Sequence, residues 1–275
     1  MGLRPRTRRG GRRAMAALAL AILPMMAGAS ARSTNFTVEA PSTEVARQVA
    51  SYAEHYRRVV ARQWIGEELP DWPRPCAVRI KITGGEAGGV TSFGFARGKV
   101  VDQEMSLEGR IDRILASALP HEVTHTIFAA YFGGPLPRWA DEGASLLSED
   151  RRERLRHERF ASDLLTRSGG WRLPDLFSIE EYPSDLMGFY GQGYSVSRFL
   201  VEMGGRPRFL AFLRDGMAGG WDAATKAHYG FSNAKELDRA WRSWHSVASH
   251  DLPRDDSHGD RLVVRAQSPE GADTR

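Results

Sequence analysis

The residues with the clearest chemical potential lie in one short stretch. Residues 119–128 read LPHEVTHTIF, with His121 and His125 four positions apart and Glu122 beside the first of them. On an α-helix, residues four apart lie on one face, so the two imidazoles can bind one metal ion in the tetrahedral arrangement typical of zinc. The glutamate can reach the open side of the metal and accept a proton from water. Two histidines alone bind zinc weakly, so this interpretation requires a third ligand.

A candidate third ligand lies in the segment RWADEGAS, residues 138–145. Its Glu142 follows His125 by 17 positions, across a GGPLP break at residues 133–137 that predicts a return of the chain as an antiparallel helix. Asp141 and Glu142 are an unusual polar pair for an apolar helix, and the small residues after them allow two helices to approach closely. The pattern therefore predicts a zinc site made of two histidines and one glutamate.

These two segments resemble the gluzincin metallopeptidases, and most closely the bacterial exported proteins called peptidase MA-like, over roughly residues 35–245. The resemblance implies an α+β, thermolysin-like gluzincin fold with Zn2+ as the cofactor. It also implies that His121, His125 and Glu142 bind the metal and that Glu122 is the general base. The implied substrate is a peptide or protein.

The resemblance extends to residues around the metal ligands. Relatives have Asn or Asp before the ligand glutamate. Asp141 is therefore expected to support a metal ligand and not to bind the metal itself. Gluzincin aminopeptidases stabilise the oxyanion with a tyrosine in a Y-x-x-G context, which Tyr190 matches in the sequence YGQG. Tyr194 is the alternative, and for either tyrosine packing on the core is an equal possibility. His228 and His245 are weaker candidates.

The chain departs from the aminopeptidases at the motif that grips the free amine of the substrate. In place of G-x-M-E-N, the segment GKVVDQEMSLEG has only Glu104 and Met105. The choice between endopeptidase and exopeptidase action therefore stays open. We expect residues 98–106 to pair with an extended substrate by β-augmentation.

The first half of the chain predicts a small mixed sheet with one long helix. Alternating residues indicate strands at 35–40 and 76–83 and a hairpin over 90–107. Residues 43–65 place apolar side chains at helical spacing, and Gly66 predicts the end of that helix.

From residue 109 onward the pattern is helical. Apolar residues recur on one face from Ile111 to Tyr131, although Pro120 predicts a kink or a fresh helix start at 118–120. A charged helix is expected at 151–167. The last helices are expected in YGQGYSVSRFLVEM, PRFLAFLRDG, WDAATKAHYG and NAKELDRAWRSWHSV.

The chain begins with the charged, apolar, small-residue order of a secretory signal peptide. Residues 1–13 hold six arginines and no acidic residue, and an apolar run follows at residues 14–29. An A-x-A-like cleavage site at 29–31 predicts a leader of residues 1–31, and a site at 27–29 fits nearly as well. The run is too short and too interrupted for a comfortable membrane span, although an uncleaved anchor stays open. We expect export to the periplasm or the extracellular space.

Charge and cysteine content narrow the classes of function further. The whole chain has a formal net charge of +4, from 38 basic and 34 acidic residues. The leader holds six of the basic residues, which leaves 32 against 34 and a net charge of −2 for the rest. A nucleic-acid partner is therefore not expected. The single cysteine, Cys76, cannot form an intramolecular disulfide and is expected to be buried.

We expect residues 32–249 to form one catalytic domain, with a β-rich part at 32–108 and a mainly helical part at 109–249. Residues 250–275 are polar and predict a disordered tail. The expected activity is zinc-dependent hydrolysis of peptide bonds, with no membrane span in the mature chain. An exported, zinc-stabilised binding or scaffold protein with a vestigial active site is the alternative. The sequence predicts no oligomeric state.

Overall fold

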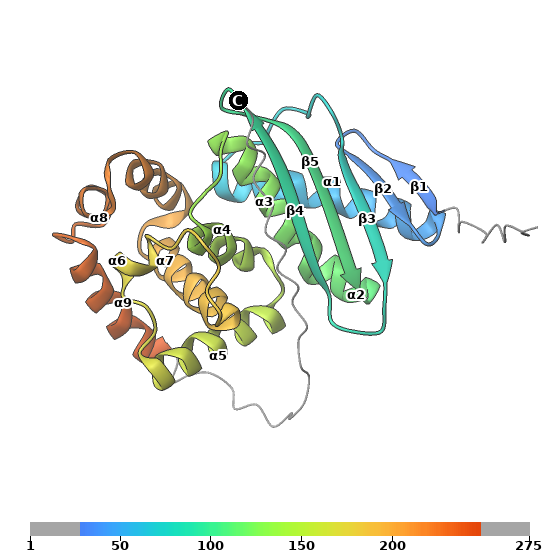
Figure 1. Cartoon of the computed structure of the whole chain (residues 1–275). Coiled ribbons are helices and arrows are strands. Elements are labelled where there is room, and N and C mark those ends of the chain that lie inside the picture. The colour runs from blue at the N-terminus through green and yellow to red at the C-terminus, as the bar shows by residue number, and fades with distance from the viewer. Residues whose placement is uncertain (1–27, 249–275) are drawn as a thin grey trace, which may run out of the picture.

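The computed structural model describes residues 28–248. In this part of the chain, a five-stranded sheet lies beside a lobe made almost entirely of helices (Figure 1). The α+β class, with a small mixed sheet before a mainly helical part, is therefore confirmed. Most of the expected leader, residues 1–27, and the expected tail at 250–275 lie outside the described residues.

The sheet contains parallel and antiparallel neighbours in the order β1-β2-β3-β5-β4. Its strands are β1 (Ala29–Arg32), β2 (Phe36–Ala40), β3 (Cys76–Ile82), β4 (Gly88–Ala96) and β5 (Lys99–Gly109). The pairs β2–β3 and β3–β5 are parallel, whereas β1–β2 and β4–β5 are antiparallel. Strand β1 crosses the boundary expected between residues 31 and 32, because the last three residues of the expected leader pair with β2.

The position of β5 corrects one expectation about the substrate. Residues 98–106 were expected to pair with an extended peptide, but residues 104–106 already pair with β3 on one side and with β4 on the other. The backbone hydrogen bonds of this part of β5 are therefore used within the sheet, whereas residues 99–103 pair with β4 alone. Among the described strands, β4 is the one at this edge with an unpaired side. Glu104, in β5, forms an ion pair with Arg79 of β3 at 3.1 Å.

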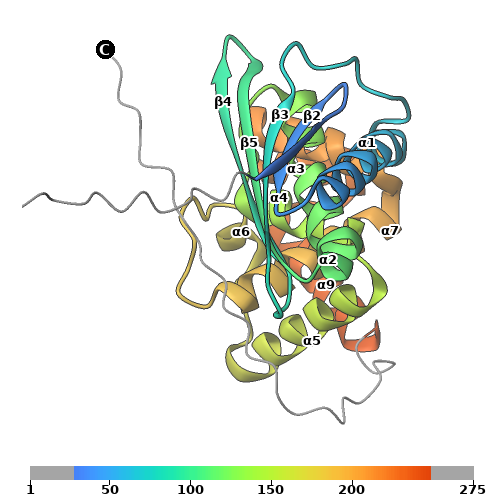
Figure 2. The same ribbon diagram turned by 90° about the vertical axis from the view of Figure 1, so that its right-hand side faces the viewer.

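Helix α1 (Thr43–Ile65) covers one face of the sheet and has the bounds that the sequence predicts. Ser42 caps its first turn by accepting a hydrogen bond from the Val45 N–H at 3.2 Å, and Gly66 ends it with a φ of 92°. The turned view shows α1 and α3 on the same face of the sheet (Figure 2). Trp64 is fully buried there, with its ring 5.0 Å from that of Phe128 on α3.

Pro120 marks a fresh helix start, as the sequence predicts. Helix α2 (Ile111–Arg113) leads into a π-helical turn (Ile114–Ala118), and α3 (Leu119–Phe132) follows directly. The Leu119 N–H donates to the carbonyl five residues back, at Ile114. Because proline has no N–H, the regular helical ladder is interrupted at residue 120 and the wider turn forms before it.

The remaining helices build the second lobe. They are α4 (Arg138–Ser145), a 3-10 turn (Leu146–Ser148), α5 (Arg151–Ser168), α6 (Leu173–Leu176), α7 (Leu186–Gly219), α8 (Trp221–Tyr229) and α9 (Ala234–Ala248). Helix α7 joins two of the expected helices across a break at Gly205, where φ is 77°. None of the helices within residues 28–248 is both long and apolar enough to cross a membrane.

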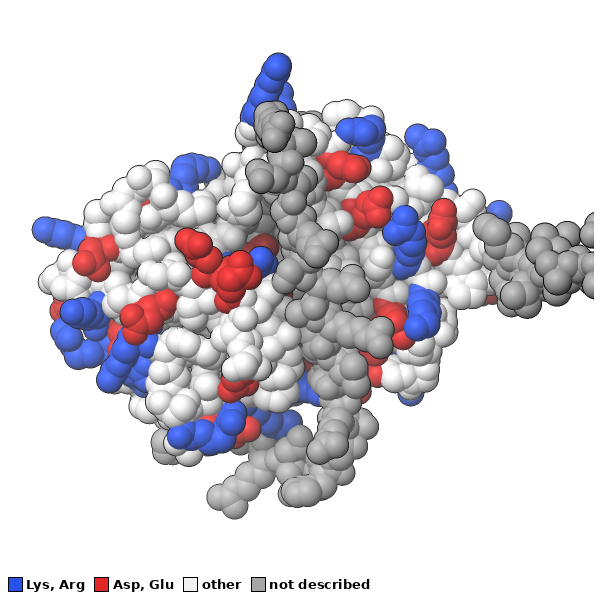
Figure 3. Space-filling model, in the orientation of Figure 1, with Lys and Arg blue, Asp and Glu red and all other residues white. Residues whose placement is uncertain are grey.

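One continuous core joins the sheet and the helical lobe. Trp139 and Trp241 are fully buried in it, and Trp139 stacks on Phe177 with ring centroids 4.7 Å apart. Cys76 is also fully buried, as expected. On the face of the molecule shown in Figure 3, acidic and basic side chains are interspersed over both lobes.

Candidate metal centre

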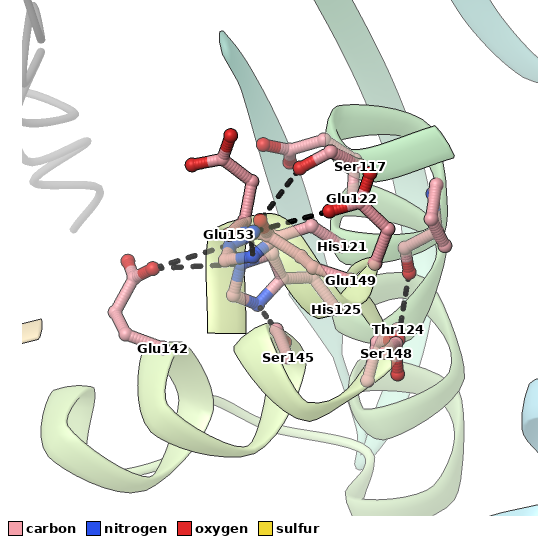
Figure 4. A network of polar contacts seen from close by, with 12 residues as sticks. Ser117, His121, Glu122, Thr124, His125, Glu142, Ser145, Ser148, Glu149 and Glu153 are labelled. Carbon is pink, nitrogen blue, oxygen red and sulfur yellow. Dashed lines mark hydrogen bonds and ion pairs between the residues drawn. The ribbon is translucent and has the colours of Figure 1, made fainter. Parts of the chain in front are cut away.

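Helices α3 and α4 bring the three predicted ligands together. His121 and His125 are one turn apart on α3, and their Nε2 atoms lie 3.1 Å from each other. The Glu142 carboxylate projects from α4, with its Oε2 atom 3.4 Å from His121 Nε2 and 3.8 Å from His125 Nε2 (Figure 4). All three side chains are buried, and one carboxylate and two imidazoles meet between two helices.

The spacing of these atoms fits a tetrahedral zinc ion. With zinc–ligand distances of ~2.0–2.2 Å, tetrahedral ligands lie about 3.3–3.6 Å apart. The observed separations of 3.1, 3.4 and 3.8 Å bracket that range. Two nitrogens and one oxygen are also the donor set of catalytic zinc sites, which keep the fourth position open.

Both histidines are oriented by carboxylates on their outer nitrogens. His125 Nδ1 lies 2.8 Å from Asp141 Oδ1, which is the supporting contact expected for Asp141. His121 Nδ1 lies 2.8 Å from Glu149 Oε1, and the Ser117 hydroxyl donates to the other Glu149 oxygen at 2.6 Å. A carboxylate on Nδ1 keeps Nε2 available for a metal and raises its basicity. Sequence reasoning missed Glu149, which no spacing rule connects to His121.

The ionisation of the cluster follows from burial and from these contacts. Burial alone would lower the pKa of His125, but the charge and hydrogen bond of Asp141 outweigh it and raise the pKa to about 9. Burial also opposes the charged form of His121, yet hydrogen bonds to Glu142 and Glu149 hold its pKa well above the usual value. Burial would raise the pKa of Glu142, whereas His121 and His125 lower it to about 2. A divalent cation would replace protons in this cluster.

Glu122 lies on the side of α3 that faces the edge strand. Its carboxylate is buried and accepts a hydrogen bond from the Thr91 hydroxyl at 2.6 Å. Gly89 makes room for it, because a Cβ atom at that position would lie 2.7 Å from Glu122 Cγ and Oε1. Burial, the largest influence, raises the pKa of Glu122, and the two histidines oppose the shift. Strand β4 therefore positions the candidate base.

A large cavity of about 970 Å³ opens over the cluster. Its walls come from β4, α3, α4, the loop at 133–137 and the segment 177–182. Tyr190, near the start of α7, lines it, and burial raises the pKa of that phenol. Tyr182, which sequence reasoning missed, also lines the cavity and donates its hydroxyl to Glu142 Oε1 at 2.6 Å.

Tyr194, the alternative candidate for the oxyanion donor, is not among the residues that line this cavity. One helical turn further along α7, its ring packs 6.3 Å from His157 of α5 and borders a separate pocket. Because four residues of helix rise about 6 Å, Tyr194 lies beside α5, away from the cavity that Tyr190 lines. His228 and His245 also lie elsewhere: the first contacts Asp215 at 2.7 Å, and the second is buried beside serines.

Comparison with known proteins adds no assignment. No protein-family model matches the chain, and no curated protein matches it. Inference about its chemistry therefore depends on the residues and geometry of the cluster.

Proposed function

We propose that this protein is a zinc-dependent peptidase of the gluzincin type, with His121, His125 and Glu142 as the metal ligands. The observation that carries the proposal is the convergence of their three donor atoms at zinc-compatible distances. The carboxylates on both outer nitrogens support it, because metal-binding histidines in proteins commonly have such partners.

The edge strand supports hydrolysis of extended peptides. Strand β4 is at the edge of the sheet, and its residues Thr91 and Phe93 line the cavity. A peptide that pairs with this edge would satisfy its backbone groups and lie alongside α3. This assigns to β4 the substrate pairing that the sequence suggested for β5.

We propose Glu122 as the general base. A bound zinc ion would supply Lewis-acid polarisation of a peptide carbonyl and of water. The Glu122 carboxylate, held by Thr91, would accept a proton from water and return it to the leaving amine. The phenol of Tyr190 faces the same cavity and stays protonated, so it can donate a hydrogen bond to the developing oxyanion.

The test combines metal analysis with cleavage of a mixed peptide library. We expect about one zinc ion per chain and cleavage that a chelator abolishes and zinc restores. The variant E122Q should retain zinc and lose about 10²–10⁴-fold in rate. The cleavage products also distinguish endopeptidase from exopeptidase action.

The same experiment distinguishes a peptidase from the alternative class of function. Zinc bound at the site without cleavage of any library peptide would favour a zinc-stabilised binding or scaffold protein. A chain that binds no zinc, or an E122Q variant with full activity, would contradict the proposed mechanism.

A further inference from the structure

A second pocket, of about 370 Å³, lies between the start of α5 and the middle of α7. It shares no lining residue with the cavity over the metal cluster. Four arginines line it, namely Arg151, Arg154, Arg198 and Arg206. The acidic residues in its lining are two glutamates, so the lining has a surplus of two positive charges.

The two glutamates are already paired. Arg198 contacts Glu158 at 2.7 Å and Glu202 at 2.7 Å. By contrast, Arg151, Arg154 and Arg206 have no ion pair with any residue in the described part, 28–248. Three guanidinium groups without an ion-pair partner therefore lie at one pocket, where like charges repel each other and a partly buried charge loses hydration.

Arg206 is the most constrained of the three. Its guanidinium lies over the Trp64 ring, 5.1 Å from the centroid. Its Nε atom is buried and has no hydrogen-bond partner among the described residues. Burial, followed by the nearby charge of Arg154, lowers the pKa of Arg206, which agrees with two cations facing each other across the pocket. A negatively charged ligand would offset both the burial of the Arg206 charge and its repulsion by Arg154.

The arginines also lie near the starts of two helical segments, although Asp150 already caps α5 by accepting a hydrogen bond from the Glu153 N–H at 3.1 Å. Helix α5 begins at Arg151, and Gly205 breaks α7 so that its second segment begins at Arg206. The first turn of a helix carries a partial positive charge and disfavours basic side chains. Arginines in these turns are therefore unfavourable on their own, and an anion bound between them would offset that cost.

The geometry points to a phosphate monoester as the ligand of this pocket. A phosphate monoester is close to a dianion at neutral pH, which matches the surplus of two positive charges. The pocket also has an apolar wall, formed by Leu147, Leu155 and Val201 with Tyr194 beside them. Its volume falls in the lower part of the range for small organic ligands, so it has room for more than the phosphate group.

Titration calorimetry of the full chain with phenyl phosphate and with inorganic phosphate, at fixed ionic strength, tests the site. We expect saturable binding of both, with phenyl phosphate tighter because its ring contacts the apolar wall. The variants R154Q and R206Q should each weaken binding about tenfold. Arg154 is partly exposed, so R154Q should fold even if R206Q does not. The matched control is R47Q, at an exposed arginine on α1.

Vesicles that contain phosphatidic acid distinguish the source of the phosphate. Binding to these vesicles but not to phenyl phosphate, again lost in R154Q, would assign the site to a lipid headgroup with the same phosphate chemistry. Two results would overturn the proposal. One is equal affinity of R154Q, R47Q and the parent chain for all three probes, and the other is no saturable binding to any of the probes.

Discussion

Thr91 and Glu122 lie 31 positions apart in the sequence, yet the Thr91 hydroxyl donates a hydrogen bond to the Glu122 carboxylate at 2.6 Å. The contact joins the free edge strand, where we propose that a peptide binds, to the residue that we propose as the base. It also holds one oxygen of a carboxylate that lines the cavity.

Replacement of Thr91 by valine should slow catalysis without removing zinc. The variant T91V keeps the shape of the side chain but leaves Glu122 without its hydrogen bond, so kcat should fall about 10–100-fold with little change in KM. Steady-state kinetics and metal analysis give both readouts. The variant T91S keeps the hydroxyl and should retain most of the activity. Equal loss in T91S and T91V would show that the hydrogen bond has no part in catalysis.

A methyl group at Gly89 should displace Glu122. An added Cβ atom would lie 2.6 Å from Leu107 Cδ2 and 2.7 Å from Glu122 Oε1, so the carboxylate must move. A misplacement of about 1 Å can lower a rate by about 10²-fold. The neighbouring Gly88 is the control, because a Cβ atom there meets nothing within 4 Å. Cleavage rates of G89A and G88A that fall together would contradict this geometry.

The carboxylates behind the histidines should control zinc affinity. In E149Q and D141N, the His121 or His125 Nδ1–H faces a neutral amide oxygen, which lowers the basicity of the ligand nitrogen. We expect zinc to bind about 10–100-fold more weakly in each variant, measured by competition with a chelating dye. Glu181 is exposed, so E181Q is the control. Zinc affinities equal to that of E181Q would refute the orienting role.

His245 should make the fold less stable in mild acid. Burial, followed by the charges of Arg198 and Arg242, lowers its pKa to about 4, whereas an unfolded histidine titrates near ~6.5. Between these values the unfolded chain binds a proton that the folded chain does not, so the free energy of unfolding falls as the pH drops from about 6.5 to about 4.

Denaturant unfolding across this pH range gives the measurement. His245 Nδ1 lies 2.8 Å from the Ser195 hydroxyl, so glutamine at 245 can keep a polar contact without titrating. The slope of the free energy of unfolding against pH reports the number of protons that the chain takes up on unfolding. We expect H245Q to lower this number by up to about one. Burial also lowers the pKa of His157, so part of the dependence should persist in the variant. The exposed His55 provides the control H55Q, and the same slope in both variants would exclude His245 as a source.

Local patterns in the sequence were sufficient to predict most of the described helices and strands and the three residues that we propose as metal ligands. The bounds of α1, the helix start beside Pro120 and the shared face of His121 and His125 follow from side-chain periodicity and backbone chemistry over a few residues. Glu142 also followed, because the short GGPLP turn left one simple way for the next helix to return.

Contacts between distant segments required the tertiary structure. The partnership of Glu149 with His121 spans 28 positions, and Tyr182 reaches Glu142 across 40. Neither pair has a spacing that a helix or a strand would impose. The free edge at β4 depends on the parallel pairing of β3 with β5, which no single strand pattern encodes.

The sequence by itself therefore determined which residues of α3 share a face and which residue types are available for a metal. Only the tertiary structure decided which carboxylates orient the histidines, which edge strand lines the cavity and which tyrosines line it. The physical reason is the distance along the sequence over which each effect acts. Side-chain periodicity relates residues within one or two helical turns, whereas the contacts behind the histidines depend on how α3, α4, α5 and the sheet pack against one another.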